Sequence, residues 1–190
     1  MKKTATLLAL LPLLAACSGE QITTETSDGF QAQAAESQSF GSDVNKDLAL
    51  LRRSTASFHD FRGGSDAGWS AQITPCMTDP GGAGGMGFHY GNVGLINGTV
   101  SVDKPQLLLY EPEKNGKLRL VAVEYIIPYT FRARSATPPR LFNRDFQQVD
   151  AFQLWGLHAW VWKENPSGMF ASWNPNVNCD NTTVVASMSH

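Results

Sequence analysis

Two β-rich runs separated by a short turn sequence constrain the fold of this chain more than any other feature. The first run, PQLLLYEP, covers residues 105–112, and the second, GKLRLVAVEYIIP, covers residues 116–128. The residues from Glu113 to Gly116 stand between them and include the glycine that a tight connection needs. Such an arrangement is typical of a β-hairpin. The sequence therefore predicts an antiparallel strand pair.

One helix is predicted ahead of the hairpin. Asp43 can cap it, Gly63 and Gly64 would stop it, and it would run to about Phe61. Apolar and small residues recur every three or four positions along this segment, at Val44, Leu48, Leu51, Thr55 and Phe58. That spacing indicates one buried face. The expected class is α+β, with this N-terminal helix packed on a mainly antiparallel β-sheet in a single disulfide-linked domain.

A further strand is expected from about Phe152 to Trp162. The turn sequence from Asn165 to Gly168 follows it, and a strand from Met169 to Trp173 is expected to continue. Alternation along the first of these strands directs His158 and Trp160 to one face and Leu157 and Val161 to the other, so both faces are largely apolar. The strand should therefore be covered on both sides.

The chain begins with the features of a secretory signal. Two lysines precede an apolar run from Leu7 to Leu14 that is too short for a permanent membrane span, and small residues follow directly before Cys17. The sequence LAAC at residues 14–17 resembles the lipobox of bacterial lipoproteins. The resemblance implies a signal peptide at 1–16 and acylation of Cys17, which would anchor the protein to a lipid bilayer. Ser18 resembles the sorting pattern for the outer membrane, facing the periplasm or the cell surface.

Residues 17–41 are predicted to be an acidic, flexible tether, and residues 42–190 the single domain. The tether is rich in Ser, Thr, Gln, Ala and Glu and has no basic residue, which is typical of a solvated segment. From residue 42 onward, Lys and Arg balance Asp and Glu one for one. Nucleic acid is therefore not expected as a partner.

Two cysteines remain for the domain once Cys17 is assigned to lipid. In an exported chain, Cys76 and Cys179 are expected to form a disulfide. A thiolate metal site is the alternative, but the chain has no CxxC motif or neighbouring Cys/His pair to support it.

Three residues on separate segments are candidates for a metal site. His158 falls among large aromatic residues, and alternation places Glu124 on the face of Leu118, Leu120, Ala122 and Ile126. His89 follows a glycine-rich run. Two imidazoles and one carboxylate are a ligand set for zinc, copper or non-haem iron. The alternative is that all three are structural polar groups with hydrogen-bond partners, and no other cofactor is expected.

Aromatic and basic residues offer a second kind of candidate site. Trp160, Trp173 and Tyr90 could form an aromatic platform for a glycan or another small molecule, although several tryptophans in a small domain are also typical of a core. Arg132 and Arg134 lie in a proline-rich loop that could bind an anion, or could simply be solvated. No arrangement of Ser, His and Asp or of Cys and His has a local signature of nucleophilic catalysis.

The glycine run from Gly82 to Gly87 matches GxGxxG, but its context differs from that of a dinucleotide site. It follows Asp79 and Pro80 rather than an evident strand, and it leads into FHYGN rather than a helix. We therefore expect these glycines to supply backbone freedom, either for a tight crossing or for a loop around a ligand.

Four segments, GGMGFHYGN, PQLLLYEP, GKLRLVAVEY and HAWVWKENPSGMFASWNPNVNC, together resemble a family of bacterial secreted proteins with no established activity. The resemblance covers roughly Cys76 to Cys179 and implies a single exported domain. The prediction is a membrane-anchored envelope lipoprotein that binds a small molecule, a glycan or an envelope protein. The alternative is a metal-binding protein or metal-dependent enzyme that uses His89, Glu124 and His158.

Overall fold

The structure is a computed structural model that describes residues 40–182. The predicted signal peptide, Cys17 and all but the last two residues of the predicted tether lie outside the described residues. Among the helices of the described part, none is long and apolar enough to cross a membrane.

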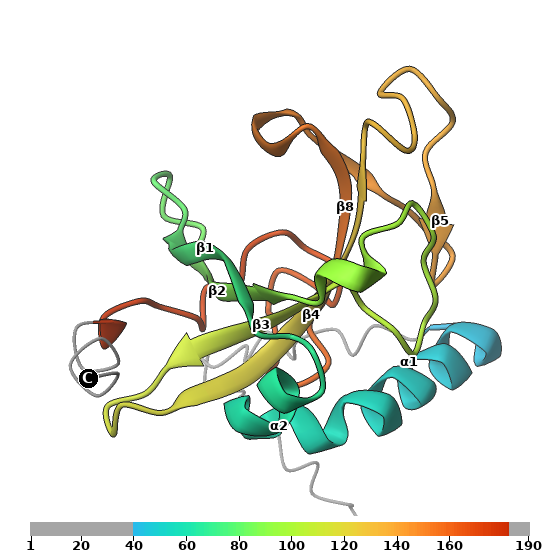
Figure 1. The fold of residues 1–190 in the computed structure, drawn as a ribbon. Helices are drawn as coiled ribbons and strands as arrows, with labels where there is room; N and C mark the ends of the chain where they lie inside the picture. Colours follow the sequence, from blue (N-terminus) through green and yellow to red (C-terminus); the bar gives the residue numbers. More distant parts are fainter. Residues whose placement is uncertain (1–39, 183–190) are drawn as a thin grey trace, which may run out of the picture. The chain divides into compact units, whose positions relative to one another are not determined.

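A six-stranded antiparallel sheet forms the centre of the domain (Figure 1). Its order is β1-β2-β3-β4-β8-β7. The central hairpin, β3 (Leu107–Pro112) and β4 (Leu118–Pro128), confirms the predicted strand pair. The other strands are β1 (Ala71–Thr78), β2 (Gly85–Gly91), β7 (Gln147–Val149) and β8 (Leu154–Ala159). A small separate sheet pairs β5 (Arg140–Leu141) with β6 (Arg144–Asp145).

The N-terminal helical segment lies against the sheet, as predicted, but its end differs from the prediction. Helix α1 (Ser42–Thr55) continues into a 3-10 turn (Ala56–His59), and α2 (Phe61–Asp66) starts after Asp60. Gly63 and Gly64 lie inside α2 and do not stop the helix. A Cβ on Gly64 would stand 2.5 Å from the Tyr110 hydroxyl, so this glycine permits close contact between α2 and the sheet.

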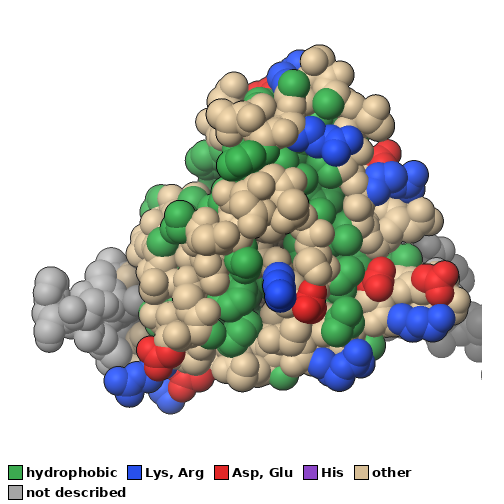
Figure 2. Space-filling model, turned by 45° about the vertical axis from the view of Figure 1, so that its right-hand side comes forward, with side chains coloured by type: hydrophobic (Ala, Val, Ile, Leu, Met, Phe, Trp, Pro, Cys, Tyr) green, Lys and Arg blue, Asp and Glu red, His purple; other side chains and the backbone are tan. Residues whose placement is uncertain are grey.

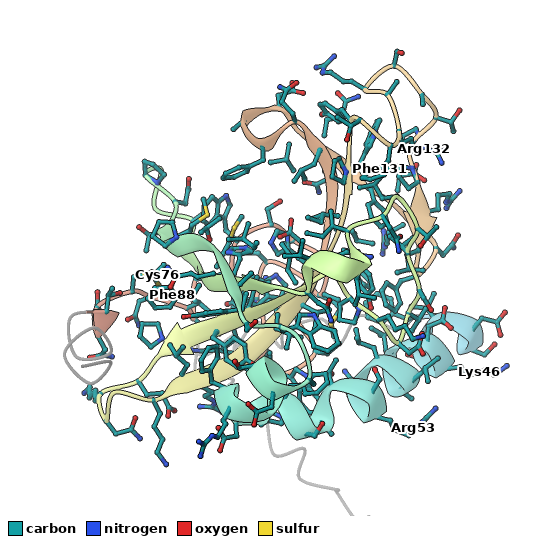
Figure 3. All side chains as sticks on the ribbon, in the orientation of Figure 1. Lys46, Arg53, Cys76, Phe88, Phe131 and Arg132 are labelled. Atoms are coloured by element: carbon teal, nitrogen blue, oxygen red, sulfur yellow. A yellow bond between two sulfur atoms is a disulfide. The ribbon has the colours of Figure 1, made fainter. Side chains whose placement is uncertain are left out.

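The face of the sheet toward the helices is a closed core. Leu48 and Leu51 of α1 pack against buried side chains of β3, β4 and β8. Polar tips in this core have partners, because the Tyr110 hydroxyl donates to the Phe58 carbonyl and the Tyr125 hydroxyl donates to the Val102 carbonyl. Lys46 and Arg53 point outward from α1 (Figure 3). The amphipathic spacing of the helix therefore predicted its buried face correctly.

The opposite face carries a second apolar cluster, and a β-bulge in β4 decides which residues reach it. The register with β3 shifts between Leu109 and Tyr110, which pair with Ala122 and Leu120. Leu118 and Leu120 therefore lie on the helix side, whereas Ala122, Glu124 and Ile126 lie on the opposite side. The prediction that Leu118 and Leu120 share a face with Glu124 was wrong, because strict alternation cannot anticipate a bulge.

The chain after β8 is mostly irregular and closes against the sheet. The predicted strand from Met169 to Trp173 is absent, and only Asn174 forms an isolated bridge, to Gly85. The disulfide Cys76–Cys179 joins β1 to this segment, with 5.8 Å between the Cα atoms, as the cysteine count predicted. The glycine-rich turn thus connects β1 to β2 and lies against the C-terminal segment.

Candidate metal centre

The three predicted metal ligands meet on the face of the sheet opposite the helices. His89 lies on β2, Glu124 on β4 and His158 on β8, where His158 pairs directly with Glu124. Glu124 Oε2 lies 3.5 Å from His89 Nε2 and 3.8 Å from His158 Nε2. One ligating atom from each residue falls within 4.8 Å of the others, and all three side chains are buried.

These separations are close to those of a metal centre. Bonds of about 2.0 to 2.1 Å to a tetrahedral zinc ion place ligand atoms about 3.3 Å apart. The two separations from Glu124 need to shorten by about 0.5 Å or less for the three side chains to share one ion, and the separation between the histidines, within 4.8 Å, by up to about 1.5 Å. Three protein ligands leave at least one coordination position for another molecule.

Thr74 fixes the orientation of the His89 ring. The Thr74 hydroxyl on β1 lies 2.8 Å from His89 Nδ1, and both residues are buried. If Nε2 is the metal ligand, Nδ1 carries the proton and donates to the Thr74 oxygen. A second hydrogen bond of this kind is the usual support for a metal-ligating histidine.

His158 has an unusual environment for a buried polar side chain. Its Nε2 atom has no hydrogen-bond partner within the described residues, and the side chain is only 8 % exposed. Its ring stacks on Trp160, with 6.2 Å between the centroids. A buried polar atom without a partner costs about 1 to 3 kcal/mol, so this nitrogen would gain from a ligand.

Burial favours the uncharged form of all three groups. Desolvation raises the pKa of Glu124 to about 8 and lowers the pKa of His158 to about 3, with a smaller contribution from His89. Desolvation also lowers the pKa of His89 to about 4, although a hydrogen bond with the Gly87 backbone acts to raise it. Near neutral pH the metal-free cluster is therefore two neutral imidazoles and a protonated carboxyl, and a metal ion would displace one proton.

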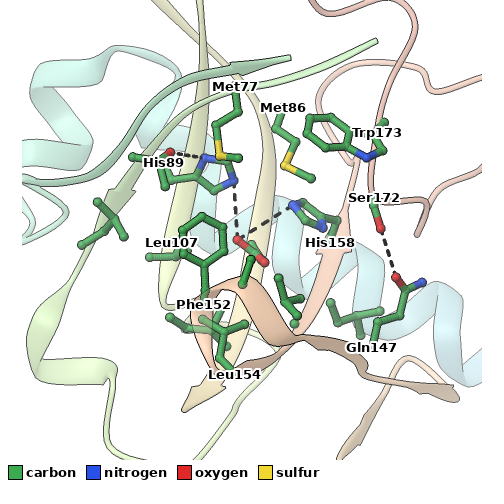
Figure 4. Close-up of a pocket in the computed structure, with 18 of the residues that line it drawn as sticks. Met77, Met86, His89, Leu107, Gln147, Phe152, Leu154, His158, Ser172 and Trp173 are labelled. Carbon is green, nitrogen blue, oxygen red and sulfur yellow. Dashed lines mark hydrogen bonds and ion pairs between the residues drawn. The ribbon is translucent and has the colours of Figure 1, made fainter. Parts of the chain in front are cut away.

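The triad lines a cavity of about 370 Å³ (Figure 4). Its remaining lining is mainly apolar and comes from β1, β2, β3, β4, β7, β8 and the C-terminal segment. The thioethers of Met77 and Met86 point toward the imidazoles. A hydrogen bond of 3.0 Å from the Ser172 hydroxyl to Gln147 Oε1 links two of the walls.

Gly156 leaves room for the carboxyl group of Glu124 on this face of the sheet. An added Cβ would stand 2.9 Å from Glu124 Oε1 and 3.2 Å from a methyl group of Val149, so a larger residue here would displace the carboxyl group. Gly156 pairs with Ile126 on β4 and with Gln147 on β7. The missing side chain thus opens the space beside the triad.

The structure separates the other candidate ligand-binding residues. Trp173 lines the cavity, but Trp160 is fully buried and donates from Nε1 to the Ala171 carbonyl. Tyr90 points to the helix side, where its ring packs on Phe61. An aromatic platform of Trp160, Trp173 and Tyr90 therefore does not form.

The arginine loop is held by its own contacts, away from the cavity lining. Arg134 forms a bidentate pair with Asp150 at 2.7 and 2.9 Å, and Arg132 donates from Nε to the Thr137 carbonyl. Figure 3 shows Arg132 on the outer loop, and Figure 2 shows acidic and basic side chains interspersed over the face that it draws. Neither arginine joins the triad.

Sequence reasoning missed several residues of the site. Thr74, Met77 and Ile73 come from β1, which was not predicted because Pro75 and the following glycines obscure its alternation. Phe152 was assigned to a strand but lies in a 3-10 turn (Asp150–Phe152) at the cavity. Met86 was also missed, because strict alternation would place it on the opposite face from His89. Gly87, whose φ is +83°, interrupts the alternation, and both residues line the cavity.

Comparison with known proteins adds no assignment: no family model, curated protein or solved structure matches this chain. The resemblance to bacterial secreted proteins stays a prediction. Function must therefore be argued from the geometry of the site.

Proposed function

We propose that this protein is a binding protein whose pocket holds one divalent transition metal ion through His89, Glu124 and His158. The observation that carries the proposal is the convergence of three buried ligating atoms, within 4.8 Å of one another, from three different strands. Structural polar groups in a core have internal hydrogen-bond partners, and His158 Nε2 has none within the described residues.

The ligand set indicates which metals to expect. Two imidazoles and one carboxylate occur in zinc sites with an open position and in the facial triad of ferrous iron. Mg²⁺ and Ca²⁺ prefer oxygen ligands and should be excluded. The thioethers of Met77 and Met86 are soft groups beside the triad, but the proposed ligands are the two histidines and the carboxylate.

Metal stoichiometry tests the proposal. Purified protein treated with a chelator and then given Zn²⁺, or Fe²⁺ without oxygen, should bind one ion per chain as measured by elemental analysis and calorimetry. His89→Ala and His158→Ala should each abolish tight binding. Thr74→Val should weaken it by about 10- to 100-fold, because it removes the hydrogen bond that orients His89.

Met86→Leu is the matched control, since it keeps the apolar volume beside the imidazoles and removes only the thioether. It should leave zinc affinity unchanged. Retained zinc binding in both histidine variants, or equal loss in Met86→Leu, would refute the proposed ligand set. Circular dichroism of each variant separates loss of metal from loss of fold.

We further propose that the protein acts at the bacterial cell envelope, anchored by acylated Cys17. The lipobox-like sequence at residues 14–17 supports this proposal, and the disulfide is weakly consistent with an oxidising compartment. Cys17→Ser should release or mislocalise the protein and leave the domain folded, as measured by membrane fractionation. Normal amounts of processed Cys17→Ser protein in the membrane fraction would mean that the anchor lies elsewhere.

A further inference from the structure

We infer that the cavity beside the triad binds a small, largely apolar molecule that carries no charge away from its one polar atom, which is held toward His89, Glu124 and His158. The inference rests on the proposed function, because that polar atom would take the open coordination position of the metal. It adds the chemical class of the ligand.

The size and lining of the cavity support an organic ligand. Its volume of about 370 Å³ lies within the usual range of small-molecule pockets, about 300 to 1,000 Å³. Apolar side chains from several strands surround it, including Met77, Leu107 and Ile126. The buried polar side chains of the lining are Thr74 and the triad, so the interior of the pocket matches a molecule that is apolar along most of its length.

The charges around the cavity argue against an anionic group away from the triad. Among the residues that line it, there is no Lys or Arg, and the only carboxylate is Glu124. Arg134, a cation of the neighbouring loop, is already paired with Asp150. Away from the triad, a carboxylate or phosphate group would therefore be buried without a cation to balance it, which is costly, whereas the bound ion supplies positive charge at the triad itself.

Two exposed apolar side chains mark the mouth of the cavity. Ile73 of β1 is 44 % exposed and Phe152 is 52 % exposed, and both line the cavity. The exposed Gln147 and Gln148 of β7 also line it. Large apolar side chains left in water at the rim of an apolar pocket provide a path for an apolar molecule to enter.

A pair of fluorescent dyes that differ only by one charged group tests the inference. N-phenyl-1-naphthylamine is uncharged, and 8-anilino-1-naphthalenesulfonate has the same rings with a sulfonate. The zinc-loaded and metal-free proteins should each bind one molecule of the uncharged dye. In the metal-free protein the sulfonate should bind at least about tenfold more weakly, since it must lose its hydration without a counter-ion.

Variants of exposed residues locate the binding site without threatening the fold. Phe152→Glu should weaken the uncharged dye at least about tenfold, because it places a charge at the mouth. Val93→Glu is the matched control: Val93 is an exposed apolar residue, 63 % exposed, outside the cavity lining. Equal weakening in both variants, equal affinity of the metal-free protein for both dyes, or no saturable binding would overturn the inference.

A third ligand tests the orientation toward the metal. 4-Phenylimidazole joins an apolar ring to a nitrogen donor, and it should change the visible spectrum of the cobalt-loaded protein, whereas biphenyl should not. An unchanged spectrum at saturating 4-phenylimidazole would refute the orientation. Zinc stoichiometry measured on the same samples distinguishes a failure of this inference from a failure of the metal proposal. A protein that binds zinc but not the dye overturns this inference, and a protein that binds the dye but not zinc overturns the metal proposal.

Discussion

The two faces of the central sheet are built from the same strands and differ in how they treat polar groups. On the helix side, the buried hydroxyls of Tyr110 and Tyr125 donate to backbone carbonyls, and α1 packs over the strands. On the other side, a cavity remains and His158 Nε2 is left without a partner within the described residues. The contrast separates polar residues that serve the core from polar residues that are available to a ligand.

The largest expected change in the free energy of unfolding concerns how tightly each face of the sheet is packed. Leu108 and Leu107 are neighbours on β3, with Leu108 in the helix-side core and Leu107 at the cavity. Leu108→Ala should lower the free energy of unfolding by about 3 to 5 kcal/mol. Leu107→Ala should cost at least about 1 kcal/mol less, because a side chain beside a void has fewer contacts to lose.

Chemical denaturation of the metal-free protein measures both values. The pair is matched in residue type, strand and burial, since Leu108 and Leu107 are 0 % and 3 % exposed. Equal costs would mean that the cavity side is packed as tightly as the helix side, and the comparison of the two faces would fail.

The next effect is a pH dependence that comes from the cavity side. Between pH 4.5 and 8, the folded protein keeps a proton on Glu124 that the unfolded chain has lost, so this group makes stability fall as pH rises. Below pH 6.5, the unfolded chain binds protons at His89 and His158 that the folded protein does not bind. These two groups therefore make stability increase as pH rises to about 6.5. The metal-free protein should be most stable near pH 6.5.

Glu124→Gln isolates the carboxyl contribution. In chelator, the wild type should lose about 1.6 kcal/mol relative to this variant between pH 6.5 and 8, as Glu124 titrates in the folded protein. The variant should lose little over this range, because glutamine does not titrate. Denaturation curves at several pH values measure the difference, and a parallel decline in both proteins would exclude Glu124 as its cause.

The smallest effect compares one polar group from each face. Tyr110→Phe removes a hydroxyl that donates to the Phe58 carbonyl at 2.8 Å, and it should cost about 1 kcal/mol. His158→Phe removes a nitrogen that has no hydrogen-bond partner in the described part of the chain, so the metal-free variant should be no less stable than wild type to within about 0.5 kcal/mol. A cost for His158→Phe as large as that for Tyr110→Phe would mean that His158 serves the core.

The sequence predicted the strong local patterns of this fold. The hairpin of β3 and β4, the buried face of α1 and the disulfide follow from runs, spacing and cysteine count. Strand β1 escaped prediction because Pro75 and irregular register weaken its alternation. Gly64 was interpreted as a helix stop, although it serves the contact with Tyr110. Contacts between distant segments decide such cases, and single-sequence patterns do not contain them.

The candidate site was predictable only as a set of residue types. Glu124 and His158 drew attention as polar residues within apolar strands, but the pairing of β4 with β8 that makes them neighbours depends on sheet order. Trp160 had the same aromatic surroundings as Trp173, yet only Trp173 reaches the cavity, because the chain leaves the strand after Ala159. The residue types indicated the chemistry of the site, and the order of the strands determined which candidate residues belong to it.

The most direct test of the metal centre is X-ray absorption spectroscopy of the zinc-loaded protein at neutral pH. The account predicts two imidazole nitrogens and at least one oxygen in the first shell, at about 2.0 to 2.2 Å. In His158→Phe the spectrum should lose one imidazole or the zinc altogether. A first shell with sulfur from Met77 or Met86, or with water oxygens alone, would contradict a centre formed by His89, Glu124 and His158.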